Sequence, residues 1–194
     1  LGRTKTTLTP LGLGCVTFGR EIDESTAFEI MDYAFDKGIT FFDTAEGYGG
    51  GQSKANRKLL LNLDDQREVT TEISSSERIV GDWIQSRDCR QHITLCTKIS
   101  TGGNRKNIHT ALDGSMKRLK TEYVDVLKMH SYDDEVPLQE TLEALSETME
   151  DNRVRVLGCS NYSADQLQKA LDISSLEGYH RFEVIQPPYN LISR

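Results

Sequence analysis

The stretch that decides the fold is FFDTAEGYGGG, residues 41–51, in which two aromatic residues precede an acid and then a tyrosine among glycines. Phe41 and Phe42 end a short apolar run, residues 40–42, which predicts a buried strand. Asp43 follows this strand directly, and Tyr48 comes next in a glycine-rich segment. The pattern therefore predicts a strand that delivers an acid and a phenol to the loop at its carboxyl end.

Predicted strands alternate with predicted helices along the whole chain. Short apolar runs predict strands at residues 11–16, 40–42, 93–97, 124–129, 154–158 and 184–185. Stretches with helical periodicity predict helices at residues 25–37, 76–87, 108–120, 138–152 and 164–171. Such alternation is typical of strand–helix units that build a parallel sheet. The predicted fold class is therefore α/β.

Local signals support these helices, and one segment breaks the rhythm. Gly38 is placed to stop the first helix, and Ser163 with Gln166 forms a capping-box pattern at the last one. In the helix at 108–120, Lys117, Arg118 and Lys120 are expected to face solvent. Residues 49–75 form an unusually long connection, interpreted as an insertion or a lid loop. Within it, residues 58–63 are a candidate helical turn and residues 67–73 a candidate short strand.

Composition limits the possible partners and the compartment. The chain has 194 residues, 37% of them hydrophobic and 27% charged, which suits one folded domain. Its 23 Lys and Arg against 30 Asp and Glu leave a net charge of -7, which argues against binding to nucleic acid or anionic membranes. No apolar run approaches the roughly 18 residues of a membrane span. The four cysteines lack the spacing of metal ligands, so we expect no metal and reduced thiols in a cytoplasmic protein.

Polar residues follow several of the predicted strands at the edge where active sites form in parallel α/β folds. These residues are Asp43, Lys98, His130 and the pair Ser160 and Asn161. A lysine half-buried at the end of a strand needs a partner, and the acid that ends the neighbouring strand is its natural counter-ion. We therefore expect Asp43 and Lys98 to form an ion pair.

The lysine gives Tyr48 a chemical meaning. A phenol with a pKa of about 10 is a poor acid near neutrality, but a nearby ammonium stabilises the phenolate and lowers the pKa. Lys98 is thus predicted to activate Tyr48 as a proton donor, and His130 to hydrogen-bond the same substrate oxygen. Taken singly, each residue also has a structural explanation, such as a loop cap, an ion pair or a core histidine. We favour the functional interpretation because several strands bring such groups to one rim.

Two glycine motifs are excluded as nucleotide sites. Residues 12–17, GLGCVT, have threonine where the dinucleotide-binding fingerprint GxGxxG requires its third glycine. The glycines at 49–51 lack the frame GxxxxGK[ST] of a phosphate loop and are interpreted as a hinge.

Taken together, the motifs resemble the aldo-keto reductase family over essentially the whole chain. They run from LGRTKTTLTPLGLGCVTFG at the start, similar to the opening hairpin and first strand of the family, through FFDTAEGYG, CTK, KRLKTEYVDVLKMHSYD, RVRVLGCSNYS and VIQPPYNLISR. The resemblance implies a (β/α)8 TIM barrel that binds NADP(H) without a Rossmann fold. It further implies reduction of a small aldehyde or ketone by hydride transfer from NADPH.

By this resemblance, the family's catalytic tetrad falls on Asp43, Tyr48, Lys98 and His130. Tyr48 would donate the proton while hydride arrives from the nicotinamide. The residues that hold the cofactor's carboxamide fall on Ser160, Asn161 and Gln186.

The chain departs from the family in three places, the smallest of which is Cys15, where the family commonly has threonine. The segment 49–75 is an insertion after the tyrosine loop, and the resemblance ends at Arg194, just after the sixth strand. Residues 1–194 are thus expected to be a single barrel domain, truncated before the seventh and eighth units, which in the family grip the 2′-phosphate. The alternatives are a redox-sensing regulatory subunit that binds NADPH with little turnover, and an inactive fragment or an interaction partner that another chain completes. The sequence names neither the substrate nor the oligomeric state.

Overall fold

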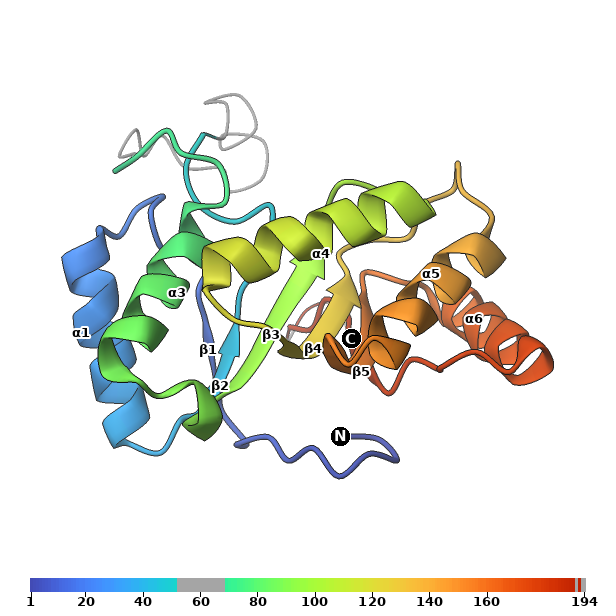
Figure 1. Cartoon of the computed structure of the whole chain (residues 1–194), viewed down its shortest axis with the longest axis horizontal. Coiled ribbons are helices and arrows are strands. Elements are labelled where there is room, and N and C mark those ends of the chain that lie inside the picture. Colours follow the sequence, from blue (N-terminus) through green and yellow to red (C-terminus); the bar gives the residue numbers. More distant parts are fainter. Residues whose placement is uncertain (52–68, 191, 193–194) are drawn as a thin grey trace.

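The computed structural model describes residues 1–51, 69–190 and 192. Six parallel strands form one sheet in the order of the chain: β1 (Gly12–Gly14), β2 (Phe41–Asp43), β3 (Thr94–Ile99), β4 (Val124–Met129), β5 (Val154–Ser160) and β6 (Val184–Gln186). The predicted fold class is confirmed, because parallel strands alternating with helices form part of a (β/α)8 barrel (Figure 1).

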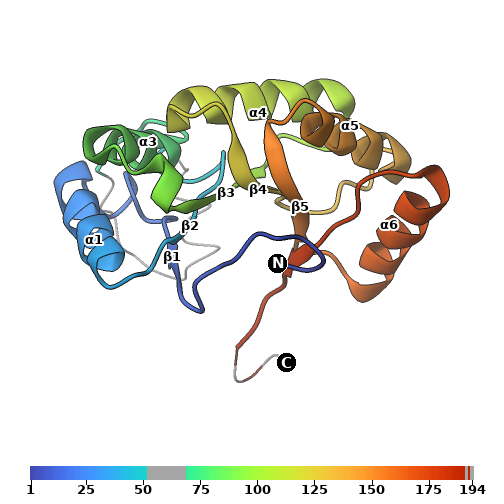
Figure 2. The same cartoon turned by 60° about the horizontal axis from the view of Figure 1, so that its bottom comes forward.

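The helices of the described residues lie on the outer side of the sheet. They are α1 (Glu24–Asp36), α3 (Ser75–Arg87), the 3-10 helix η1 (Arg90–His92), α4 (Arg105–Leu119), α5 (Leu138–Glu150) and α6 (Ala164–Glu177). Figure 2 shows the α-helices in an arc around the strands, with the N-terminal segment crossing the open side. No helix in the described part of the chain is both long and apolar enough to cross a membrane.

Side-chain alternation along the strands produces two cores. The larger core lies between sheet and helices, where the fully buried Trp83 packs its ring against Phe35 and Phe42. The smaller core lies inside the curve of the sheet and contains Cys96 and Val126. Successive side chains of a strand point to opposite faces of the sheet. Charged side chains on the inner face therefore lie inside the curve of the sheet. The strand ends therefore place polar groups in a partly apolar interior.

Most helix boundaries follow from capping chemistry. The predicted capping box is present: Ser163 Oγ accepts from the Gln166 N–H at 3.1 Å, and the Gln166 side chain accepts from the Ser163 N–H at 2.9 Å. Gly38 takes a positive φ just after α1, as predicted. Helix α6 runs six residues past its predicted end at residue 171, to Glu177, because packing against α5 outweighs the weak helix propensity of its serines. The short helix η1 was not predicted.

Two predictions about the surface segments are wrong. Residues 1–10 form no opening hairpin; instead the Thr4 N–H and hydroxyl both donate to the Leu1 carbonyl, and such side-chain bonds compete with strand ladders. Residues 69–73, the described part of the candidate strand 67–73, are not a strand. The candidate turn at 58–63 and most of the insertion at 49–75 lie outside the described residues.

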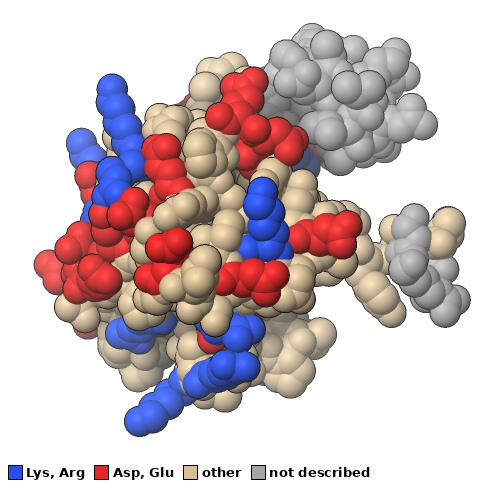
Figure 3. Space-filling model, turned by 90° about the vertical axis from the view of Figure 1, so that its right-hand side faces the viewer, with Lys and Arg blue, Asp and Glu red and all other residues tan. Residues whose placement is uncertain are grey.

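Arg118 was expected to face solvent, but its side chain is only 29% exposed. Its Nε donates at 2.7 Å to Glu77, whose side chain is fully buried in α3, and the other Glu77 oxygen accepts from the Thr97 hydroxyl at 2.5 Å. This ion pair joins α3 to α4, which approach closely because Gly81 leaves no side chain between them. On the face shown in Figure 3, several groups of acidic side chains lie among uncharged and basic ones, in keeping with the net charge of -7.

Candidate active site

The candidate site lies at the carboxyl ends of β2, β3 and β4. In the register of the sheet, Asp43 pairs with Cys96, and Lys98 pairs with Lys128 on the next strand. Since residues two apart on a strand share a face, Cys96 and Lys98 point to the same side of β3 as Asp43 does on β2. The sheet thereby brings one carboxylate and two ammonium groups together at its inner face.

The Lys98 ammonium has three acceptors. Its Nζ donates to Asp43 Oδ2 at 2.7 Å, to the Thr44 carbonyl at 2.9 Å and to Tyr48 Oη at 3.3 Å. An ammonium has three N–H donors, so these contacts use its full capacity. Lys98 is only 1% exposed, and the predicted ion pair with Asp43 is confirmed. The Lys98 ammonium therefore contacts both the Asp43 carboxylate and the Tyr48 hydroxyl.

The charges of the pair are mutually stabilised. Burial on its own raises the pKa of Asp43, but Lys98 and then Lys128 hold the pKa of this carboxyl below its usual range. Burial likewise lowers the pKa of Lys98, but the Asp43 carboxylate outweighs it and leaves the pKa above its usual value. Both groups are thus charged at neutral pH despite their burial.

The glycines that follow Tyr48 pack closely against the segment that leads into α3. Gly49 has a φ of 117°, and a Cβ there would lie 2.2 Å from Ser75 Oγ. The Gly50 N–H donates to the same hydroxyl at 3.0 Å, and the Ser76 N–H donates to the Tyr48 carbonyl at 3.4 Å. The expected hinge at 49–51 is therefore anchored on the start of α3, which fixes the backbone that carries the phenol.

His130 lies beside the phenol, at the end of β4. The ring centroids of Tyr48 and His130 are 5.4 Å apart in an edge-on arrangement, and His130 Nδ1 hydrogen-bonds with Ser100 Oγ at 2.7 Å. Burial, and next the nearby Lys98 ammonium, lower the pKa of His130 to about 4. The imidazole is therefore neutral at pH 7, and its Nε2 has no partner among the described residues.

The site contains a second lysine, Lys128, which the sequence analysis missed. Its Nζ donates to Asp43 Oδ1 at 3.2 Å and to Gln186 Oε1 at 2.8 Å. A Cβ at Gly158 on β5 would lie 2.4 Å from Val184 Cγ1 and 3.2 Å from Lys128 Cγ, so the glycine is needed first for the close approach of β6 and also leaves space beside Lys128. A lysine inside the apolar run 124–129 was the available signal, since a buried lysine requires a partner.

Ser160, Asn161 and Gln186 meet at the ends of β5 and β6. Ser160 Oγ donates to the Gln186 carbonyl at 3.0 Å, and Asn161 Nδ2 donates to the His130 carbonyl at 2.9 Å. The Gln186 side-chain amide is occupied at both ends: it accepts from Lys128 and donates to Asp43 Oδ2 at 3.3 Å. A cavity of about 340 Å³ lies alongside, bordered by Asp43, Lys128 and Gln186. All predicted site residues thus lie at one end of the barrel.

Comparison with known proteins agrees with this arrangement. The sequence model of the aldo/keto reductase family matches residues 10–194 of the chain. Among curated proteins, the uncharacterized oxidoreductase YrpG of Bacillus subtilis is 31% identical over 208 residues, covering 100% of this chain and 58% of that protein. The aldo-keto reductase YhdN of the same organism is 32% identical over 197 residues, covering 95% and 51%.

A fungal protein gives a similar match. Norsolorinic acid reductase B of Dothistroma septosporum is 31% identical over 209 residues, covering 96% of this chain and 47% of that protein. The chain spans about half the length of the curated relatives it matches.

Proposed function

Because the chain belongs to the aldo/keto reductase family, we propose that it supplies the proton-delivering part of an enzyme that reduces an aldehyde or ketone with NADPH. The relatives named above are described as an oxidoreductase, an aldo-keto reductase and a reductase, which agrees with a hydride-transfer reaction. The choice of NADPH over NADH rests on the family alone.

The observation that carries the proposal is the position of Lys98 between Asp43 and Tyr48. When a phenol gives up its proton, negative charge develops on its oxygen, and the Lys98 ammonium lies 3.3 Å from that atom. A preformed cation next to developing charge lowers the barrier without reorganisation during the reaction. In this proposal Tyr48 is the general acid, and Asp43 keeps Lys98 charged and in place.

His130 orients the substrate rather than donating the proton. Its imidazole is neutral at pH 7, because its pKa is about 4, so it acts as a hydrogen-bonding group and carries no charge toward the substrate. The edge-on contact with Tyr48 places it beside the phenol. A carbonyl oxygen held by His130 would therefore lie next to the Tyr48 hydroxyl. This geometry favours protonation of oxygen at the moment hydride reaches carbon.

The residues at β5 and β6 fit a nicotinamide carboxamide in part. A bound nicotinamide would supply the hydride. Asn161 Oδ1 makes no hydrogen bond within the described part of the chain. The Ser160 hydroxyl already donates to the Gln186 carbonyl at 3.0 Å and accepts from Asn161 Nδ2 at 3.2 Å, so it keeps one lone pair that could accept from a carboxamide N–H. Gln186 is different, because Lys128 and Asp43 occupy both ends of its side chain. We therefore assign the carboxamide to Ser160 and Asn161, with Gln186 available only after release from Lys128.

The state of the cysteines agrees with a reducing compartment. All four cysteines, Cys15, Cys89, Cys96 and Cys159, are buried and unpaired. Since disulfides are rare in the cytosol, we propose a cytoplasmic location for the protein.

The test is oxidation of NADPH by the purified protein with a panel of aliphatic and aromatic aldehydes and ketones, followed at 340 nm. We expect turnover with at least one carbonyl class, and slower turnover with NADH. Binding is measured in parallel from the fluorescence of Trp83. Tight NADPH binding without turnover on any carbonyl would reject the enzyme and indicate a redox-sensing subunit, and no binding would indicate an inactive chain.

A further inference from the structure

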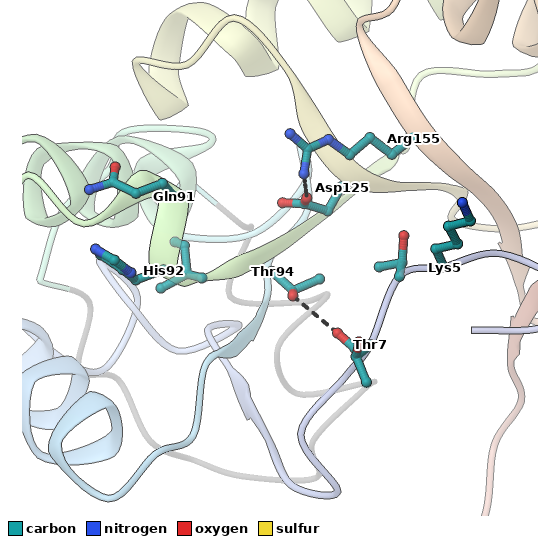
Figure 4. Close-up of a pocket in the computed structure, with 9 residues that line it drawn as sticks. Lys5, Thr7, Gln91, His92, Thr94, Asp125 and Arg155 are labelled. Carbon is teal, nitrogen blue, oxygen red and sulfur yellow. Dashed lines mark hydrogen bonds and ion pairs between the residues drawn. The ribbon is translucent and has the colours of Figure 1, made fainter.

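A second polar pocket lies at the opposite end of the strands from the candidate active site. It has a volume of about 380 Å³ and is bordered by the N-terminal segment, η1 and the beginnings of β3, β4 and β5. Figure 4 shows Lys5 and Thr7 on one side, His92 on the other, and Thr94, Asp125 and Arg155 between them. These residues have no part in the proposed reduction.

Two of the residues that line this pocket, Asp125 and Arg155, belong to an ordered charged cluster that also includes Arg90 and Tyr123 outside the lining. The buried Asp125 carboxylate pairs with Arg90 at 2.8 Å and with Arg155 at 2.9 Å, and it also accepts from the Leu95 N–H at 2.9 Å. The guanidinium groups of Arg90 and Arg155 each lie 3.9 Å from the centroid of the Tyr123 ring. Stacking and a shared carboxylate thus fix the Arg155 guanidinium before any ligand arrives, although its side chain is 55% exposed.

The cluster carries more positive than negative charge. One carboxylate serves two guanidinium groups, so Arg90, Arg155 and Asp125 together keep one net positive charge. Lys5 adds a second charge, and within the described residues neither its ammonium nor the His92 ring has an ion-pair partner. This excess is unusual in a chain whose net charge is -7. An unmatched, partly preorganised cation cluster in a pocket is complementary to a small anion.

The remaining lining favours an oxyanion over a halide. Thr6 borders the pocket and offers a hydroxyl donor, whereas the Thr94 hydroxyl already donates to the Thr7 carbonyl at 3.4 Å, which ties the N-terminal segment to β3. Guanidinium, ammonium and hydroxyl donors are the groups that bind phosphate oxygens. The volume also exceeds that of a bare ion, which leaves room for a small organic group attached to it.

We propose that this pocket binds a phosphate-bearing small anion, held by Arg155 and Lys5. Inorganic phosphate and phosphate monoesters share this chemistry, so both are tested. The proposal does not depend on carbonyl reduction, because the pocket and the Tyr48 site lie at opposite ends of the strands.

The experiment is a titration followed by two-dimensional amide NMR of the purified protein at pH 7.5, with ionic strength held constant by NaCl. Inorganic phosphate and glycerol 3-phosphate are added in separate arms, and acetate and extra NaCl serve as reference anions. We expect saturable shifts of the Thr7 and Thr94 amides with both phosphates, at midpoints on the order of 1 mM. The compound that binds more tightly shows whether the pocket prefers free phosphate or a phosphate monoester.

Lys5→Gln is the decisive variant, because Lys5 contributes no ion pair in the described structure and its loss leaves the fold intact. We expect at least about fivefold weaker phosphate binding in Lys5→Gln and in His92→Gln, and a larger loss in Arg155→Gln. Lys169→Gln, an exposed lysine on α6, is the control and should bind like the original protein. Shifts that fail to saturate, that acetate reproduces, or that survive unchanged in Lys5→Gln would overturn the proposal.

Discussion

The Lys98 ammonium lies 3.3 Å from the Tyr48 hydroxyl oxygen, and this contact links two parts of the chain that are 50 residues apart. Lys98 belongs to β3, which is paired with a strand on each side, whereas Tyr48 belongs to a loop that is held by its hydrogen bonds to the start of α3. The contact therefore depends on two separate anchors. If the chain reduces carbonyls, the chemistry requires both anchors to be in place.

Replacement of Tyr48 by phenylalanine removes only the hydroxyl. We expect kcat for carbonyl reduction to fall by about 10² to 10⁴-fold, which is the usual contribution of a positioned general acid, while NADPH affinity stays the same. Steady-state rates and Trp83 fluorescence measure the two quantities. Tyr33→Phe is the control, because Tyr33 is 68% exposed on α1. A rate for Tyr48→Phe within threefold of the original would exclude the proton-donor role.

The two buried lysines offer a matched comparison, because both contact Asp43 but only Lys98 contacts Tyr48. Lys98→Met and Lys128→Met should each destabilise the fold by about 1–3 kcal/mol, since the remaining lysine still pairs with Asp43. Activity should separate them: Lys98→Met loses at least about 100-fold in kcat, and Lys128→Met much less. Urea unfolding and steady-state rates measure both effects.

Equal losses of kcat in the two methionine variants would contradict a special role for the Tyr48 contact. They would indicate that the total charge around Asp43 matters, rather than the position of one ammonium.

The sequence predicted the strands, most of the helices and the ion pair of Asp43 with Lys98, because these depend on local periodicity and on residues that end strands. Lys128 was missed because its partner Gln186 is far away in sequence and meets it only through the register of β4, β5 and β6. The packed glycines after Tyr48 were interpreted as a hinge for a similar reason. Only the positions of Ser75, Thr70 and Thr71 in space show that a Cβ would clash at Gly49, Gly50 and Gly51, respectively.

The burial of Glu77 likewise depends on a contact with a residue far away in the sequence, and it leads to a prediction about stability. Helical periodicity put Arg118 on the solvent side of α4, yet Arg118 provides the countercharge for a carboxylate with no exposed surface. Arg118→Met should destabilise the fold by about 3–5 kcal/mol, because Glu77 is left buried and uncompensated.

Lys117→Met, at an exposed neighbouring position on α4, is the control and should change stability by less than about 0.5 kcal/mol. Both values come from urea unfolding at pH 7. The double variant Glu77→Gln with Arg118→Met should recover part of the loss, since it removes the buried charge. Without such recovery, the destabilisation of Arg118→Met would have to come from lost packing.

His130 predicts how stability depends on pH. Its pKa is about 4 in the folded chain, against about 6.5 when unfolded, so between these values the unfolded chain takes up a proton that the folded chain does not. Stability should therefore fall as the pH drops, by about 2 kcal/mol from pH 7 to pH 5. Urea unfolding at a series of pH values, in buffers without phosphate, measures this slope.

The variant His130→Gln should lose this pH dependence between pH 7 and pH 5, because glutamine cannot take up a proton. His92→Gln serves as the control: His92 is exposed on η1, and its replacement should leave the slope unchanged. Asp43 does not interfere in this range: its pKa is lowered in the folded chain, so its contribution is lost only as the pH falls below its ordinary value of 3.8. If His130→Gln kept the full slope, the imidazole would have to be protonated in the folded state at pH 5, and the neutral hydrogen-bonding role proposed for it would fail.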